Sequence, residues 1–375
     1  MFPQLLQRIE KQFSEGKPLV AYRKPGQQNV NAIFQSDGLL NYCKDFEETG
    51  FIFAPFDDSE PVILLKPDEV HKADFVESEQ QGDQSSKSAV IYPPIDPSEK
   101  NFHLQLVAKA IEEIKQGTFK KVVLSRRILS PIQGTPLQLF LKLLKTYPLA
   151  FCYMWYHPKV GLWLGATPEE LVRIRNKEIR TMSLAGTQPY TGDPNPHWGE
   201  KEKEEQKMVT DYITNAIQGM VSQLKISKTE SVQAGGLMHL RTIIEGRLEQ
   251  LDIKKLLEEV HPTPAVGGLP KKDAYEFIKA NENYDREYYT GYLGELNFKE
   301  ETSRSSNRRN IENRAYRSIH TKTDLYVNLR SMQIIGQKAS IYVGGGITKD
   351  SVPEQEWEET VNKASTMLKV IQNRS

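Results

Sequence analysis

The sequence predicts an α+β fold, in which strand hairpins and separate helices occur along one chain. Two apolar stretches, AFCYMWY and VGLWLGA, lie close together within residues 150–166, and residues 171–186 form a hairpin pattern with Asn176 and Lys177 at its tip. Amphipathic helical patterns lie elsewhere, at 101–117, 137–148, 200–221 and 351–371. Because strands and helices do not alternate one by one, the pattern argues against a doubly wound sheet.

The first part of the chain is predicted to open with a helix. MFPQLLQRIEKQFSEG is amphipathic, and short strands such as AIF and ILLKP follow it within residues 1–75. Residues 76–100 are rich in Ser, Gln, Asp and Pro, and they are predicted to be a linker or long loop. The helix that starts at 101 ends at Gly117, KVVLSRRI forms the next strand, and the helix after it stops at Pro148.

The last part of the chain is predicted to hold two more strands and a final helix. DLYVNLRSMQI and ASIYVGGGI have the composition of strands, and Ser351 is expected to cap the helix that follows. Residues 299–323, KEETSRSSNRRNIENRAYRSIHTKT, are predicted to be a mobile polar insertion. The glycines at 344–346 either give a flexible strand exit or let backbone amides approach a carboxylate closely.

Composition excludes several classes of protein. The 375 residues include 49 basic and 49 acidic ones, so the net charge is zero, and no long basic run indicates nucleic acid as a partner. The longest apolar stretch, 149–156, is too short to span a bilayer, and the N-terminus lacks the features of a signal peptide. The two cysteines, Cys43 and Cys152, have no zinc-site spacing. We expect a reduced, cytoplasmic protein without membrane contact.

Two acidic helices far apart in the sequence are the strongest sign of chemistry. Glu202 and Glu205 lie three residues apart in one helix, and Glu356 and Glu359 have the same spacing in the other. This spacing places both carboxylates of a pair on one helix face, and in the first helix that face is the apolar one. Two such pairs facing each other would form an all-oxygen site of the kind that magnesium prefers.

A simpler interpretation of the acidic pairs stays open at this point. Glutamates are common in the first turn of a helix because they suit the helix dipole, and most of them are solvated. The usual catalytic motifs give no further help, because the chain has no Walker loop, no HExxH, no CxxC and no dinucleotide fingerprint.

Five ordered motifs resemble those of the chorismate-utilising enzymes, which are the isochorismate, salicylate, anthranilate and aminodeoxychorismate synthases. The motifs are GATPEEL at 165–171, SLAGT at 183–187, HPTPAVGG at 261–268, EYYTGYLGEL at 287–296 and YVGGGITKDSVPEQEWEETVNKA at 342–364. The resemblance covers about residues 100–372. It implies two large, mostly antiparallel sheets packed in a sandwich with helices on the outside. Residues 1–100 would be a variable N-terminal part of the same fold, and 101–375 the chorismate-binding catalytic region of a single intimate domain.

The resemblance implies that the acidic pairs bind Mg²⁺. Glu205 and Glu359 match the family's magnesium ligands, and Glu202 and Glu356 would bind the ion directly or through water. The ion would in turn hold the ring carboxylate of chorismate. The first acidic motif departs from the family at Gln206, where histidine is usual, and we expect Gln206 to keep a hydrogen-bonding role.

Other residues match positions that contact the substrate. Arg330 matches an arginine that grips a substrate carboxylate, and Tyr289 matches the tyrosine beside it. Lys363 matches a lysine near the ring carboxylate, although it could equally be a surface partner of Glu359 one turn away. His239 matches the active-site histidine, although a lone histidine is more often a core residue. The backbone positions that line the substrate match Gly186, Thr187, Gly268, Gly344, Gly345 and Gly346.

Three positions distinguish the members of the family. Lys121 matches the general base of the water-using members, where the anthranilate type has glutamine; locally it is also an ordinary strand-flanking residue. Glu169 matches the acid that protonates the leaving C4 hydroxyl, which requires a raised pKa. Its local sequence also fits a helix start, with Glu170 in the capping role. Ala185 excludes the covalent lysine route of the aminodeoxychorismate type.

The resemblance therefore predicts an isochorismate synthase, which isomerises chorismate by water attack at C2 with loss of the C4 hydroxyl. One alternative is a salicylate synthase, which goes on to eliminate pyruvate, and another is a catalytically silent chorismate-binding paralogue. An amidotransferase subunit would need a glutaminase partner and a different residue at 121, so no glutaminase subunit is expected. The product could serve menaquinone or siderophore biosynthesis, and the sequence does not choose between them.

Overall fold

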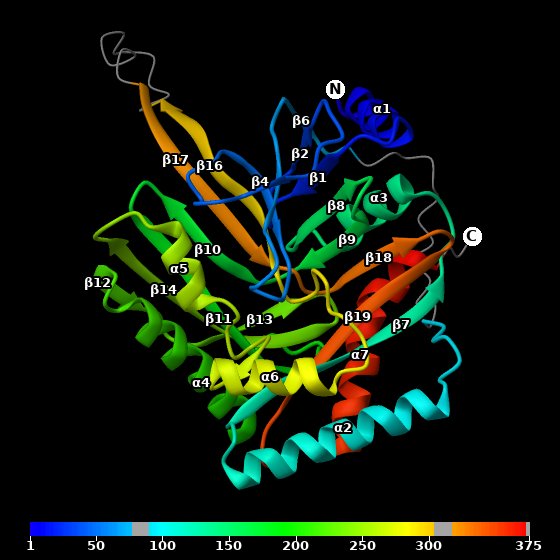
Figure 1. Ribbon diagram of the computed structural model, residues 1–375, viewed down its shortest axis with the longest axis vertical. Coiled ribbons are helices and arrows are strands. Elements are labelled where there is room, and N and C mark those ends of the chain that lie inside the picture. Colours follow the sequence, from blue (N-terminus) through cyan, green and yellow to red (C-terminus); the bar gives the residue numbers. More distant parts are fainter. Residues whose placement is uncertain (77–89, 304–316, 373–375) are drawn as a thin grey trace.

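The computed structural model describes residues 1–76, 90–303 and 317–372 (Figure 1). Its helices are α1 (Phe2–Ser14), α2 (Pro97–Gln116), α3 (Pro136–Thr146), α4 (Glu200–Ile217), α5 (Ile253–Val260), α6 (Lys271–Asn281) and α7 (Pro353–Ile371). The strands of the first half are β1 (Leu19–Arg23), β2 (Asn29–Phe34), β3 (Asn41–Tyr42), β4 (Gly50–Ala54), β5 (Ile63–Leu65), β6 (Glu69–Asp74), β7 (Lys121–Pro131), β8 (Phe151–His157), β9 (Gly161–Thr167), β10 (Glu170–Arg175) and β11 (Glu178–Pro189). Those of the second half are β12 (Val221–Ile226), β13 (Glu230–Ala234), β14 (Leu237–Leu248), β15 (Gly268–Leu269), β16 (Tyr292–Ser303), β17 (Arg317–Val327), β18 (Ser331–Ile335) and β19 (Lys338–Ile347).

The strands form two antiparallel sheets, which confirms the α+β prediction and the two-sheet sandwich. The nine-stranded sheet has the order β15-β7-β19-β18-β9-β8-β1-β2-β6, and the ten-stranded sheet has the order β12-β14-β11-β10-β17-β16-β4-β5-β3. Each sheet takes three strands from the first hundred residues, β1, β2 and β6 in one and β3, β4 and β5 in the other. The N-terminal part is thus an integral part of both sheets.

An aromatic core fills the space between the sheets. Alternate residues of a strand face opposite sides, so on β1 Val20 and Tyr22 point into this core while Leu19 and Ala21 point to the outer face. Phe53 lies at the centre, with its ring 4.6 Å from that of Trp155 and 5.9 Å from that of Trp163.

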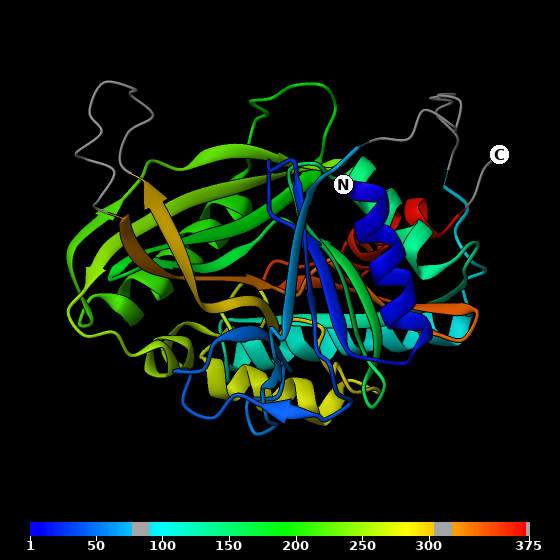
Figure 2. The same ribbon diagram turned by 90° about the horizontal axis from the view of Figure 1, so that it is seen from above.

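Helices cover the outer faces of both sheets. Side chains of α1, α3 and α7 pack on the nine-stranded sheet, and those of α4 and α5 pack on the ten-stranded sheet. The remaining helices, α2 and α6, pack together against β7, and Figure 2 shows them on one side of the molecule. The result is two sheets enclosed by helices, with α4 and α7 on different sheets.

Several helix boundaries differ from the predicted ones. Helix α2 begins at Pro97, inside the expected loop, because the Asp96 side chain accepts a hydrogen bond from Ser98 N and caps the helix. Helix α4 ends at Ile217, and Val221 already belongs to β12. Val352, not Ser351, is the N-cap of α7, because the Ser351 hydroxyl accepts from Thr348 N instead.

The predicted insertion at 299–323 is wrong at both of its ends. Residues 299–303 and 317–323 extend the β16–β17 hairpin, with Lys299 opposite Thr321 and Ser303 opposite Arg317. Their side chains are mostly polar, so no alternation of apolar and polar residues marked them as strand. The expectation for 304–316 lies outside the described residues. The hairpin extends away from the rest of the molecule in Figure 1.

Two crossovers between the sheets interrupt predicted elements. DLYVNLRSMQI is split, because β17 of the ten-stranded sheet ends at Val327 and β18 of the nine-stranded sheet begins at Ser331. The helix start that the local sequence also fits at 167–170 is absent, because Thr167 ends β9 in one sheet and Glu170 starts β10 in the other. Both crossovers contain a residue that the sequence singled out for chemistry.

Candidate active site

The two crossovers lie side by side and bring Glu169 and Arg330 together. Val327 N donates to Glu169 O at 3.1 Å, and Ala166 N donates to Arg330 O at the same distance. Arg330 has a positive φ of 48°, which turns the chain from one sheet to the other. A carboxyl and a guanidinium that are 161 positions apart in sequence (330 minus 169) thus share one wall of a cavity.

The glycines at the end of β19 allow close approach of charged side chains. They pair with β7, with Gly346 opposite Val123 and Gly344 opposite Ser125. A Cβ on Gly346 would lie 2.8 Å from both Glu205 Oε1 and Lys121 Cε, so any other residue would push these side chains away. The glycines therefore allow close approach of side chains, and the predicted approach of their backbone amides to a substrate carboxylate stays a prediction.

Three of the four predicted metal ligands gather at these glycines, and each has a lysine partner. Glu205 Oε1 lies 2.7 Å from Lys121 Nζ. Glu356 Oε1 lies 3.0 Å from Lys201 Nζ, and Glu359 Oε1 lies 2.6 Å from Lys363 Nζ. Glu202 does not join them. Its side chain lies against Gly199 at the start of its own helix, where its Oε2 is 2.6 Å from the position that a Cβ of Gly199 would take.

The electrostatics of these glutamates differ. Burial opposes the charge of Glu205, but Lys121 outweighs it and holds the pKa of Glu205 below its ordinary value. Burial and the neighbouring charge of Glu359 raise the pKa of Glu356, and Glu356 Oε2 is buried without a hydrogen-bond partner. An unpartnered buried oxygen beside a second carboxylate is suited to a cation.

The donor atoms are nevertheless not assembled as a metal centre. Within the part of the chain that the structure describes, no three acidic, histidine or cysteine side chains gather closely enough to hold a metal ion. The oxygen chemistry fits magnesium, whereas each of the three glutamates is paired with a lysine in this structure.

A neutral histidine holds Arg330 in place. His239 is buried, and burial together with Arg330 lowers its pKa well below the ordinary value, so the ring is neutral near pH 7. His239 Nδ1 lies 3.1 Å from Gly186 O and therefore carries the proton, and Nε2 accepts from Arg330 at 2.6 Å. Arg330 also donates to Ala234 O at 2.9 Å. No carboxylate among the described residues forms an ion pair with it.

Glu169 is a buried carboxyl that keeps its proton. Its surface is 3% exposed, and burial raises its pKa to about 8, although Lys121, Arg330 and Lys363 act in the opposite direction. Near neutral pH the group is mostly protonated, so it can donate a proton. Its neighbour Glu170 does not cap a helix as predicted: it accepts from Arg180 at 3.0 Å and also from Arg173.

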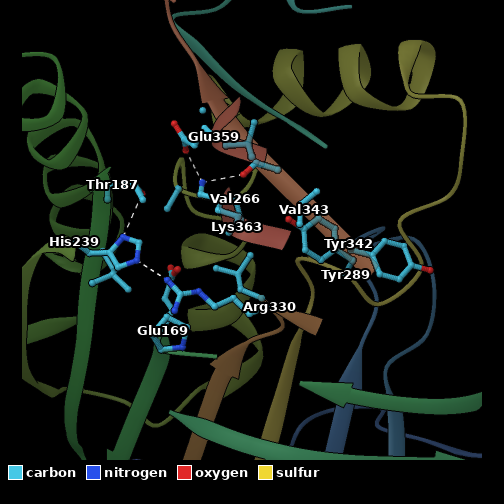
Figure 3. Close-up of a pocket in the computed structure, with 18 of the residues that line it drawn as sticks. Glu169, Thr187, His239, Val266, Tyr289, Arg330, Tyr342, Val343, Glu359 and Lys363 are labelled. Carbon is cyan, nitrogen blue, oxygen red and sulfur yellow. Dashed lines mark hydrogen bonds and ion pairs between the residues drawn. The ribbon is translucent and has the colours of Figure 1, made fainter. Parts of the chain in front are cut away.

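These groups surround one cavity with about 830 Å³ of empty space, part of it open to solvent (Figure 3). The figure shows Arg330, His239 and Glu169 together on one side, with the Lys363–Glu359 pair apart from them. The predicted residues that line the cavity are Glu169, Gly186, Thr187, Glu205, His239, Tyr289, Arg330, Gly344, Gly346, Glu359 and Lys363. The strand extension of β16–β17 thus leaves Tyr289 and Arg330 at the same site.

Five predicted residues do not line the cavity itself, namely Lys121, Glu202, Gly268, Gly345 and Glu356. Lys121 is fully buried directly behind Gly346 and Glu205, which do line it. Gly268 packs against β7, where a Cβ would lie 2.4 Å from Lys121 O. It therefore allows this strand contact rather than a contact in the cavity.

The sequence interpretation missed the apolar part of the cavity wall. That part consists of Val123, Leu184, Ala265, Val266, Leu329, Ile341, Val343 and Met367, together with the ring of Tyr342. Tyr342 stacks on Tyr289 with the ring centroids 5.4 Å apart. Most of these residues lie in or beside the five motifs, so their positions in the motifs could have identified them as part of the cavity wall.

Known proteins resemble this chain in sequence. Two models of the chorismate-binding enzyme family match residues 59–303 and 315–369. The isochorismate synthase MenF of Escherichia coli is 30% identical over 282 residues, which are 72% of this chain and 59% of that protein. An anthranilate synthase component 1 of Methanothermobacter thermautotrophicus is also 30% identical, over 71% of this chain and 55% of its own length. The match thus spans less than two thirds of these relatives.

Solved structures share the fold. A putative 2,3-dihydroxybenzoate-specific isochorismate synthase, DhbC of Bacillus anthracis, superposes with a TM-score of 0.75 at 22% identity, over 96% of this chain and 98% of the other. The structure of MenF from Escherichia coli gives 0.72 at 22% identity, over 95% and 89% of the two chains. No helix in the described ranges is both long and apolar enough to cross a membrane.

The raised pKa of Glu169 predicts a pH-dependent stability. The unfolded carboxyl ionises near its ordinary pKa of 4.5, whereas the folded one keeps its proton to about 8, so folding becomes less favourable as pH rises through this interval. Glu169→Gln should therefore raise the free energy of unfolding at pH 8, by at most about 5 kcal/mol, and change it little at pH 4. Denaturant titrations at both pH values measure this difference.

The matched control is Glu170→Gln. Glu170 is equally buried but is bound by Arg173 and Arg180, so this variant should lose stability at pH 8. Equal losses for both variants would contradict the assignment of Glu169 as a protonated group.

Proposed function

The chain belongs to the chorismate-binding enzyme family, and we propose that within it the chain is an isochorismate synthase. The observation that carries the proposal is a proton-holding carboxyl, Glu169, that lines the cavity, together with a buried lysine, Lys121, directly behind the cavity-lining Gly346 and Glu205. An acid for the leaving hydroxyl and a base for the attacking water are the two groups that this isomerisation requires. A relative and two structural neighbours are named isochorismate synthases.

Arg330 is the group that binds a carboxylate of chorismate. It is partly buried, and burial lowers its pKa to about 10, yet the partners that the described residues offer it are a neutral histidine and a backbone oxygen. A partly buried guanidinium without a negative partner favours an anion, which it can bind through two parallel hydrogen bonds. Tyr289, beside it in the cavity, stacks on Tyr342 and is held in a fixed orientation.

Lys121 takes the proton from the attacking water. As its oxygen bonds to C2, the water loses a proton to the amine, the ring double bonds shift, and the C4–O bond breaks. Glu169 gives its proton to the departing hydroxyl, which leaves as water. Lys121 can act only as a neutral amine, and Glu205 at 2.7 Å stabilises the ammonium form. We therefore infer that this contact loosens when chorismate binds.

Magnesium is the proposed cofactor, which Glu205 and Glu359 would hold with Glu356 close by. It would supply positive charge for the ring carboxylate of chorismate. Lys363 contributes to the same region, since its ammonium donates to Gly344 O at 2.9 Å and pairs with Glu359. No glutaminase partner is required, because water rather than ammonia is the nucleophile.

The first test is a product assay. The purified protein, incubated with chorismate and MgCl₂ with and without ammonium, should yield isochorismate alone by chromatography. Salicylate with pyruvate would show a salicylate synthase, and anthranilate with ammonium would overturn the role of Lys121. Retained chorismate binding without any turnover would show a silent paralogue.

Lys121→Ala should reduce kcat/KM by about 10²–10⁴-fold, because it removes the base. The circular dichroism spectrum should stay that of a folded protein. Lys120→Ala is the matched control, since Lys120 is the exposed neighbour, and it should keep full activity. Near-normal turnover by Lys121→Ala would show that another group activates the water.

Glu359→Gln should raise the magnesium concentration for half-maximal activity at least tenfold, which corresponds to about 1.4 kcal/mol of lost binding free energy. The amide keeps the shape of the side chain but loses the charge. Glu358→Gln, on the exposed side of the same helix, should leave the titration unchanged. An unaltered titration for Glu359→Gln would remove it from the ligand set.

A further inference from the structure

One uncharged side chain connects the acidic helix α4 to the part of the cavity that holds Arg330. Gln206 is 2% exposed and points from α4 onto β11 and β14. Its Oε1 accepts from Ala185 N at 2.9 Å. Its Nε2 donates to Ser183 Oγ at 2.8 Å and Thr242 Oγ1 at 3.0 Å, and lies 3.2 Å from Ser183 O. Both ends of the amide are therefore used.

The bond to Ala185 N lies directly beside a bulge in β11. The pairing with β14 shifts between Ala185 and Thr187, which leaves Gly186 unpaired with a φ of +66°. Because Gly186 is bulged, its carbonyl oxygen accepts from His239 Nδ1. The bulge thus determines the orientation of the imidazole, which in turn accepts from Arg330.

The other end of the connection is the acidic helix. Gln206 directly follows Glu205, which pairs with Lys121. The first turns of α4 lie against the same bulge, since a Cβ on Gly186 would be 3.2 Å from Glu202 Cβ. A shift of α4 relative to β11 would therefore move Glu205 and the His239–Arg330 pair apart.

We propose that Gln206 is a positioning residue, which locks α4 onto the β11 bulge and so holds His239 and Arg330 in the geometry that binds chorismate. The inference rests on the proposed function only for its kinetic readout, because chorismate binding can be measured without turnover. The critical contact is the one to Ala185 N. The contacts with Ser183 orient the amide for it, and the bond to Thr242 adds stability.

The test compares three variants that remove hydrogen-bonding groups at different positions. Gln206→Met keeps the length of the side chain and loses every bond. Thr242→Val removes one buried partner of the amide but leaves the Ala185 bond. Gln218→Met makes the same chemical change at the exposed C-cap of α4. The dissociation constant of chorismate is measured by calorimetry in EDTA, and the melting temperature of each variant is recorded.

Gln206→Met should weaken chorismate binding at least tenfold, and raise KM with it if turnover is present. Thr242→Val should lower the melting temperature yet keep the dissociation constant within twofold, and Gln218→Met should change neither. If Gln206→Met fails to fold, Gln206→Asn replaces it, because it keeps the amide but is too short to span the gap, and the same loss is expected.

A purely structural role would give a different pattern. Unchanged chorismate binding in a destabilised Gln206→Met variant would overturn the proposal, and so would equal losses of binding in Gln206→Met and Thr242→Val. A wild-type protein that binds chorismate but makes no isochorismate would refute the proposed function alone.

Discussion

The ion pair between Lys121 and Glu205 joins the two halves of the sandwich at the cavity. Lys121 belongs to β7 of the nine-stranded sheet, and Glu205 to the helix that covers the ten-stranded sheet. A fully buried lysine without a negative partner would cost several kcal/mol, so this contact constrains how the sheets meet. Gly346 leaves the space for it, and α4 must begin close to the bulge of β11 to supply it.

Around this pair, burial decides which of the groups at the cavity are charged and which are neutral. Positive charge is concentrated at Arg330 and the lysines, while two groups that are often charged are neutral. His239 is neutral because of burial and Arg330, and Glu169 is mostly neutral because of burial. The cavity thus combines uncompensated positive charge at Arg330 with a proton donor nearby, which suits a substrate that carries carboxylates and must lose a hydroxyl.

The rigidity of the site comes from its position in the fold. Glu169 and Arg330 are on short crossovers that hydrogen-bond to each other, and both crossovers continue into strands on each side. Gln206 adds a link between α4 and β11, and the stacked rings of Tyr289 and Tyr342 connect the cavity to the aromatic core between the sheets. Side chains held in this way are preorganised, so little reorganisation is needed when a ligand binds.

The sequence by itself determined the α+β class, the main helices and hairpins, and the charged residues that line the cavity. Local periodicity specifies helices such as α3 and the hairpin at Asn176, and ordered motifs identify Glu169, His239 and Arg330. Only the tertiary structure decided the partners of these residues. Glu170 fits a helix cap locally but binds two arginines, and Glu205 fits a solvated first turn but pairs with Lys121, 84 positions away. The contacts of Glu170 lie within the ten-stranded sheet, whereas the contact of Glu205 depends on how the two sheets meet. The spacing of residues along one element does not encode that meeting.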